Sequence, residues 1–276
     1  MNITYVPVLA ILRDLYSQPR DMNRFRTYLE TMLQGTDDVV VPITAANPMA
    51  KEHALAKANE LLALGAEEVG AAAAQEAASR LAAVPGQFKA TLVLADDDAG
   101  GWTNRYLSEA TSRFDARVDR QRNLVCGLLW TSESPTREAI REALLGDIYR
   151  AAYRYHIGPA TTLRAMLEQE GHAAVFAGGH PTLTLDALDR ARAVTTPFLD
   201  TAVYAQQFAT FYGDAAAVSV GYRPLGLPPR AGFEVALADA RAARRDPVAV
   251  LADALTADPP PAPEPGARSR ARRAAQ

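Results

Sequence analysis

Segment 96–106 (Asp-Asp-Asp-Ala-Gly-Gly-Trp-Thr-Asn-Arg-Tyr) carries the densest group of residues that could do chemistry in this 276-residue chain. Three acids follow an apolar stretch, and carboxylate oxygens are the ligands that hard cations prefer. We therefore predict Asp96 and Asp98 as ligands of a divalent cation, Mg²⁺ or Mn²⁺. Because Asp also forms turns and stabilises helix starts, an ordinary structural role for these acids stays open.

The second half of this segment has the residue types of an anion-binding loop. Glycine allows the backbone to approach a ligand, and a helix beginning near Trp102 or Thr103 would present free N–H groups and partial positive charge. Arg105 could add a bidentate contact to a phosphate or carboxylate. With one polar residue from an earlier loop, the predicted ligand-binding set is Asn47, Gly100, Gly101, Trp102, Thr103, Asn104 and Arg105.

Three residues elsewhere in the chain are predicted as catalytic. Lys51 is one of three lysines beside 26 arginines, and a lysine can act as a base, form a Schiff base or bind phosphate. Glu133 follows a predicted strand and is a candidate general base. His180 follows a glycine pair after another predicted strand. His53 would not share a helix face with Lys51 and is interpreted as an ordinary packed or solvent-facing histidine.

Short motifs narrow the possible classes of protein. The acidic triplet after a strand resembles the metal-binding signature of nucleotide-sugar glycosyltransferases, over residues 96–98 alone. Two helices predicted upstream and the lack of a recognisable nucleotide pocket differ from that family, so no activity is carried over from it. The chain has no H-E-x-x-H, C-x-x-C, Walker A or G-x-G-x-x-G pattern, which argues against a common zincin, zinc ribbon, P-loop NTPase or dinucleotide-binding enzyme.

Alternating strands and helices must position these residues. Short apolar, β-branched runs separated by helical patterns predict an α/β fold with a mostly parallel sheet of about four or five strands covered by helices. Ligands of such sheets bind outside the carboxyl ends of the strands, where the polar segments of this chain lie. The predicted strands are 38–43, 88–95, 124–130 and 172–177, with a fifth short strand considered at 215–222.

Helical periodicity fills the remaining sequence, including extra helices at both ends. We predict one globular domain over residues 1–257 and a disordered tail rich in Pro and Arg over 258–276. The aromatic run beginning at Tyr204 is interpreted as core or as an oligomer interface. The predicted helices cover 8–16, 25–33 after a capping Asp21, 51–83 with a break near Gly65, 136–155, 161–169, 184–194, 198–212 and 232–244.

Composition excludes several other classes. The chain is 49% hydrophobic and 22% charged with a net charge of −3, values that argue against a disordered chain, a nucleic-acid surface and a polybasic membrane anchor. The single cysteine, Cys126, allows no internal disulfide. No apolar stretch approaches the roughly 20 residues that span a bilayer, and the N-terminal sequence lacks the order of a signal peptide. We therefore expect a cytoplasmic protein without a membrane partner.

Two functional hypotheses follow. The first is an α/β enzyme, a transferase or a hydrolase, that acts on a small polar or anionic metabolite at the carboxyl edge of the sheet, with or without a divalent cation. The second is a non-catalytic metabolite-binding or oligomeric assembly protein that uses the same strand ends. Nucleic-acid binding would depend on the arginine-containing tail alone and is disfavoured.

Overall fold

A computed structural model describes residues 1–33, 46–98, 104–115, 123–134 and 136–256. The predicted strand 38–43, the predicted tail 258–276 and residues Gly100 to Thr103 of the predicted ligand-binding set lie outside these ranges. Among the described residues, no helix has the length and apolar character needed to cross a membrane.

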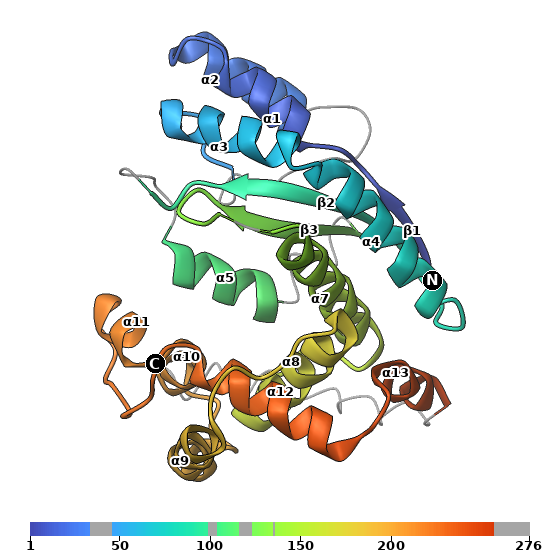
Figure 1. Cartoon of the computed structure of the whole chain (residues 1–276), viewed down its shortest axis with the longest axis vertical. Coiled ribbons are helices and arrows are strands. Elements are labelled where there is room, and N and C mark those ends of the chain that lie inside the picture. Colours follow the sequence, from blue (N-terminus) through green and yellow to red (C-terminus); the bar gives the residue numbers. More distant parts are fainter. Residues whose placement is uncertain (34–45, 99–103, 116–122, 135, 257–276) are drawn as a thin grey trace, which may run out of the picture.

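A small parallel sheet lies at the centre of the N-terminal half (Figure 1). Its strands are β1 (Asn2–Tyr5), β2 (Gln87–Ala95) and β3 (Leu124–Trp130), in the order β1-β2-β3. The central strand β2 is buried from Ala90 to Ala95, as a strand covered on both faces should be. The predicted strands 88–95 and 124–130 are confirmed. β1 has only four residues and was not predicted, because so short a strand carries no periodicity.

The prediction of four or five strands is wrong for the described residues, which form three. Residues 172–177, predicted as a strand, form the end of helix α8 (Leu163–Ala177). The predicted helix 161–169 therefore continues through Gly171. A glycine is needed there because α8 crosses a later helix at this residue, and an added Cβ would approach the carbonyl oxygen of Ala236 to 2.4 Å. Residues 215–222 are not a strand either, since α11 (Asp214–Ser219) occupies most of them.

Helices cover both faces of the sheet (Figure 1). The sequence contains signals for where some of these helices begin and end. The Asp21 carboxylate caps the helix that follows it by accepting from two backbone N–H groups. Gly65, at φ 77°, separates two consecutive helices. On one face lie α1 (Leu9–Tyr16), α2 (Met22–Tyr28) with its π-helical extension Leu29–Leu33, α3 (Glu52–Ala63) and α4 (Ala66–Arg80). On the other lie α5 (Arg105–Phe114) and α7 (Arg137–His156).

The C-terminal helices form a layer beyond α5 and α7 (Figure 1). Phe208, Phe211 and Tyr212 of the predicted aromatic run are buried there, whereas Tyr204 is 44% exposed. The run therefore contributes mainly to the core of this layer. Besides α8 and α11, its elements are α9 (Leu185–Thr195), the 3-10 turn η2 (Thr196–Phe198), α10 (Tyr204–Tyr212), α12 (Ala231–Ala243) and α13 (Pro247–Thr256).

A buried ion network joins the sheet-covering helices to this layer. Glu170 of α8 accepts hydrogen bonds from Arg150 Nε at 2.8 Å and from Arg113 Nη1 at 2.6 Å. Arg113 of α5 also pairs with Glu109 at 2.8 Å, and Arg230 reaches the same Glu109 carboxylate at 3.3 Å. Both carboxylates are almost fully buried, so each depends on its arginine partners for compensation.

We expect this network to make the protein sensitive to acid. Burial alone would raise the pKa of Glu109, but Arg113 and Arg230 outweigh it and hold the pKa at about 2, below the ordinary 4.5. Because the pKa is depressed, the ionised Glu109 carboxylate stabilises the fold above pH 4.5, by roughly 3 kcal/mol of unfolding free energy for a shift of this size. This stabilisation is lost as the pH falls toward 2. Urea unfolding across this pH window should show the loss, and Glu109→Gln should remove that part of the pH dependence. An unchanged profile in the variant would contradict the assignment.

Candidate functional site

The carboxyl ends of β2 and β3 form a polar edge of the sheet. The register pairs Ala95 with Trp130, so the residues that follow, Asp96 and Thr131, emerge side by side. Helices α3 and α5 both begin at this edge, which brings their N-terminal ends to the strand ends (Figure 1). The edge is therefore built by the parallel arrangement, as in other open α/β sheets.

Asp96 and His53 form a close pair at this edge. His53 Nε2 lies 2.7 Å from Asp96 Oδ1, and the Asp96 side chain is 2% exposed whereas the His53 side chain is 23% exposed. The carboxylate is thus buried behind an imidazole ring that solvent and small molecules can reach.

Asn47 fixes the orientation of the Asp96 carboxylate. The backbone N–H of Met49 donates to Asn47 Oδ1 at 3.0 Å, so the amide end of the side chain faces Asp96 and donates to Oδ2 at 2.8 Å. Oδ1 is left for His53, and because a carboxylate only accepts, Nε2 of a neutral His53 must carry the ring proton. Nδ1 then has a free lone pair, and no hydrogen bond to it is found within the described segments. The geometry gives His53 the protonation pattern of a general base.

Thr131 connects Asp96 to the neighbouring Asp97. Its hydroxyl lies 3.3 Å from Asp96 Oδ1 and 3.1 Å from Asp97 Oδ1, and it accepts from the Asp97 backbone N–H at 3.1 Å. Ser132 holds Asp97 further, with its backbone N–H at 3.1 Å from Oδ1 and its hydroxyl at 2.8 Å from Oδ2. Since Thr131 has one proton to donate, it can satisfy only one of the two carboxylates at a time.

Arg105, the first residue of α5, also lies at this edge of the sheet. Its guanidinium forms a close ion pair with Glu133, lies 3.8 Å from Asp97 Oδ2 and is 5.3 Å from the centre of the Trp130 ring. Burial would lower the pKa of Arg105, but the Glu133 carboxylate outweighs it and the pKa is raised. Asn104 caps α5 by accepting from the Leu107 backbone N–H at 3.0 Å. Carboxylates of the protein itself therefore already neutralise the charge of Arg105.

A group of buried polar side chains from α1 and α2 lies behind this edge and was not predicted. Arg24 and Tyr16 are 3% and 4% exposed, and Arg24 Nη2 donates to the carbonyl oxygen of Ala50 at 2.8 Å. Burial lowers the pKa of Arg24 and, helped by the nearby Asp96, raises that of Tyr16. Burial likewise raises the pKa of Tyr28 to about 12. In sequence these residues belong to an amphipathic helical pattern, which gives no sign of a polar cluster.

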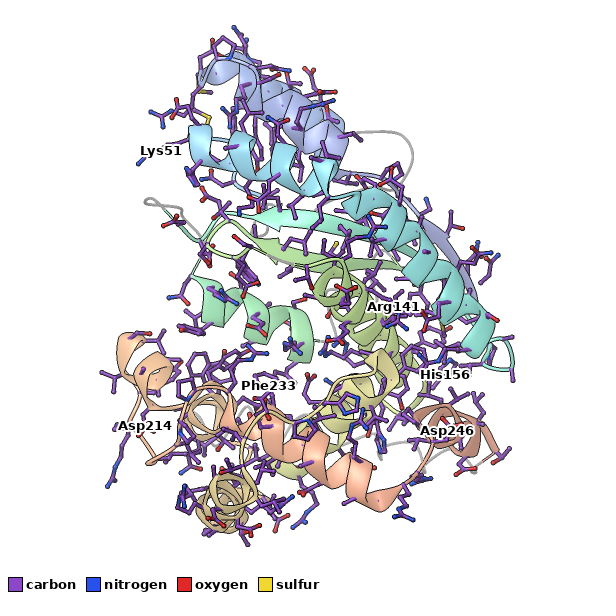
Figure 2. All side chains as sticks on the ribbon, in the orientation of Figure 1. Lys51, Arg141, His156, Asp214, Phe233 and Asp246 are labelled. Atoms are coloured by element: carbon purple, nitrogen blue, oxygen red, sulfur yellow. The ribbon has the colours of Figure 1, made fainter. Side chains whose placement is uncertain are left out.

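The other described residues of the predicted site fall in two places, this edge of the sheet and the C-terminal layer. Lys51 is exposed at the start of α3, where Figure 2 shows its side chain projecting from the helix. His180 follows α8 in the C-terminal layer and lies 3.2 Å from Arg241 Nη2 of α12. Glu133 and Asn104 do lie at the edge, as described above. Asp98 is exposed at the same edge, one residue beyond Asp97.

The cation prediction stays a prediction. In the described part of the chain, no group of three or more His, Cys, Asp or Glu side chains is placed to hold a metal ion. Both carboxylate oxygens of Asp96 already accept hydrogen bonds, from Asn47 and His53. A cation at Asp96 would have to displace or share these donors.

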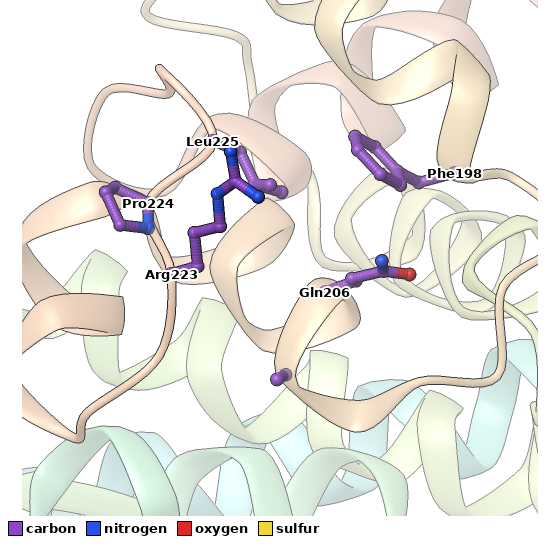
Figure 3. A pocket seen from close by; sticks show the side chains of 6 residues that line it. Phe198, Gln206, Arg223, Pro224 and Leu225 are labelled. Atoms are coloured by element: carbon purple, nitrogen blue, oxygen red, sulfur yellow. The ribbon is translucent and has the colours of Figure 1, made fainter.

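Two cavities lie in the C-terminal layer, away from this edge of the sheet. One, of about 370 Å³, lies against α10 (Figure 3), and none of its lining residues is an acid or a histidine. The other, of about 380 Å³, lies between α8 and α12 and includes His172. Burial lowers the pKa of His172, which favours the neutral ring. The first cavity is lined by Phe198, Ala205, Gln206, Arg223, Pro224 and Leu225.

Comparison of the chain with protein-family models, with curated proteins and with solved structures gives no match in any of the three. The class of protein is therefore defined here by the fold and the site alone: a mixed α/β protein with a small parallel sheet and a polar carboxyl edge.

Proposed function

We propose that the protein is an enzyme that binds a small polar or anionic metabolite at the carboxyl edge of its sheet and uses His53, oriented by Asp96, to transfer a proton to or from it. The observation that carries the proposal is the 2.7 Å contact between His53 Nε2 and the buried Asp96 carboxylate. Proton transfer by such a base is a step that both group transfer and hydrolysis require.

The chemistry follows from the two environments of the pair. A buried carboxylate holds the imidazole in one tautomer and stabilises the imidazolium that forms when Nδ1 accepts a proton. The His53 side chain is partly exposed, and the proposal requires that a substrate reach Nδ1 from that side. In this proposal His53 takes the catalytic role that the sequence assigned to Lys51 and His180, and Glu133 is a partner of Arg105 rather than a free base.

The test is a screen for turnover of small metabolites by the full chain. We expect product from the wild-type protein and none from His53→Gln, because glutamine keeps a donor for Asp96 but has no basic nitrogen. His156→Gln is the matched control: His156 contacts the Pro85 carbonyl oxygen at 2.8 Å, next to the start of β2 at the other end of the sheet, so this variant should keep full turnover. A metabolite that co-purifies unchanged, with no turnover of any compound, would favour the non-catalytic binding protein instead.

A further inference from the structure

Arg24 is a buried cation, and Glu52, the acid that interacts with it electrostatically, forms no ion pair with it. Arg24 lies on α2, donates to the Ala50 carbonyl oxygen and has its guanidinium 5.0 Å from the centre of the Tyr16 ring. Within the described residues no carboxylate lies within ion-pair distance of it. A buried charge without a close counter-ion is destabilising, so an external anion bound at Arg24 would stabilise it.

Three polar atoms in the same region are buried and have no hydrogen-bond partner in the part of the chain that the structure describes: Arg24 Nε, the Tyr16 hydroxyl and the Tyr28 hydroxyl. Native structures leave few such groups unsatisfied. All three can donate a proton, and they come from the adjoining helices α1 and α2. Arg24 donates to the carbonyl oxygen of Ala50, three residues before His53, which brings this cluster near the Asp96–His53 pair. Asp96 also contributes to the raised pKa of Tyr16.

The first turn of α3, which begins with the acid Glu52, lies at the same place. Ala50, whose carbonyl oxygen binds Arg24, lies three residues before His53, and α3 begins at Glu52 with no side chain capping its first turn. The N–H groups of a helix start favour a bound anion. Arg105, the anion ligand predicted from sequence, is unlike Arg24 because Glu133 and Asp97 already neutralise it.

We propose that Arg24 and the Tyr16 hydroxyl form a recognition site for an oxyanion, a carboxylate or a phosphate group, beside the Asp96–His53 pair. As a substrate-binding site it rests on the proposed function: the substrate is then a small acid whose anionic group binds Arg24 while His53 exchanges a proton with another part of the molecule. Binding of the anion itself does not require that any reaction occurs.

The test compares Arg24→Met with Arg26→Met, an exposed arginine of the same helix. Melting temperatures are measured with inorganic phosphate, with acetate and with chloride at equal ionic strength. We expect phosphate, acetate or both to raise the melting temperature of the wild-type protein and of Arg26→Met, and to leave Arg24→Met unchanged. A response to phosphate alone identifies a phosphate group and a response to acetate alone a carboxylate, whereas no response in the wild type overturns the proposal.

Stability without added anion gives an independent readout. Because Arg24→Met removes an uncompensated buried charge, we expect its melting temperature in chloride to be at least that of the wild type. Tyr16→Phe keeps the ring against Arg24 and should weaken anion binding at least tenfold at unchanged stability. If the wild-type anion response persists in both variants, the site is wrong. His53→Gln should keep the anion response even where turnover is lost, so failure of the proposed reaction and failure of this site are distinguishable.

Discussion

Replacement of Asp96 by asparagine should reduce turnover about 10⁴-fold, the scale found when the carboxylate of a catalytic triad is replaced by an amide. The Asn47 amide donates to the position of Oδ2, so the new side chain must place its carbonyl oxygen there and its amide group toward His53. That amide then donates to Nε2, which moves the ring proton of His53 to Nδ1 and removes the base. The measurement is kcat of Asp96→Asn with a substrate found by the screen.

Asp98→Asn separates this explanation from the cation prediction. If Asp96 acts through His53, the variant at Asp98 should keep most of its turnover. If the two acids instead hold Mg²⁺ or Mn²⁺, both variants should lose turnover and a high concentration of the cation should restore part of it. Full turnover in Asp96→Asn, with the protein folded as judged by circular dichroism, would contradict both.

Removal of the Glu170 side chain should lower the free energy of unfolding by about 3 to 5 kcal/mol, because breaking a buried ion pair leaves an uncompensated charge. Glu170 is 2% exposed and accepts from both Arg113 and Arg150. Burial alone would raise its pKa, but Arg150 and Arg113 outweigh burial and lower it. The carboxylate is therefore charged in the folded protein. Urea unfolding of Glu170→Ala measures the loss.

Glu168→Ala is the matched control on the same helix. Its side chain is 51% exposed, and its contact with His172 is long, at 3.9 Å, so we expect a change of less than about 0.5 kcal/mol. Equal losses in the two variants would show that α8 tolerates no alanine on either face. A loss below about 1 kcal/mol in Glu170→Ala would show that the network is weaker than its burial implies.

The sequence predicted the two longer strands of the sheet, β2 and β3, and failed where local signals conflicted with packing. The runs 88–95 and 124–130 are continuous apolar stretches, typical of buried parallel strands. Residues 172–177 have a similar composition but continue a helix, because Gly171 lies in the crossing of α8 with α12. The close approach of two helices depends on the tertiary arrangement, which a local pattern does not contain.

The candidate site was predictable only in part. Polar residues at the ends of β2 and β3 pointed to this edge of the sheet, and the structure places Asp96, Asn47 and Glu133 there. The contact of His53 with Asp96, on which its proposed role depends, was missed because the two residues are 43 positions apart in the chain. Arg24 was missed because a charged residue in an amphipathic helix is ordinarily exposed, and its burial became visible only with the helices in place.

The tautomer of His53 tests the central claim most directly. The chain has four histidines, so long-range ¹H–¹⁵N correlation spectra of histidine-labelled protein can be assigned by comparison with His53→Gln. We expect neutral His53 to carry its proton on Nε2, toward Asp96, and to have an unprotonated Nδ1, with the reverse pattern in Asp96→Asn. A proton on Nδ1 in the wild-type protein would contradict the claim that Asp96 orients His53 as a base.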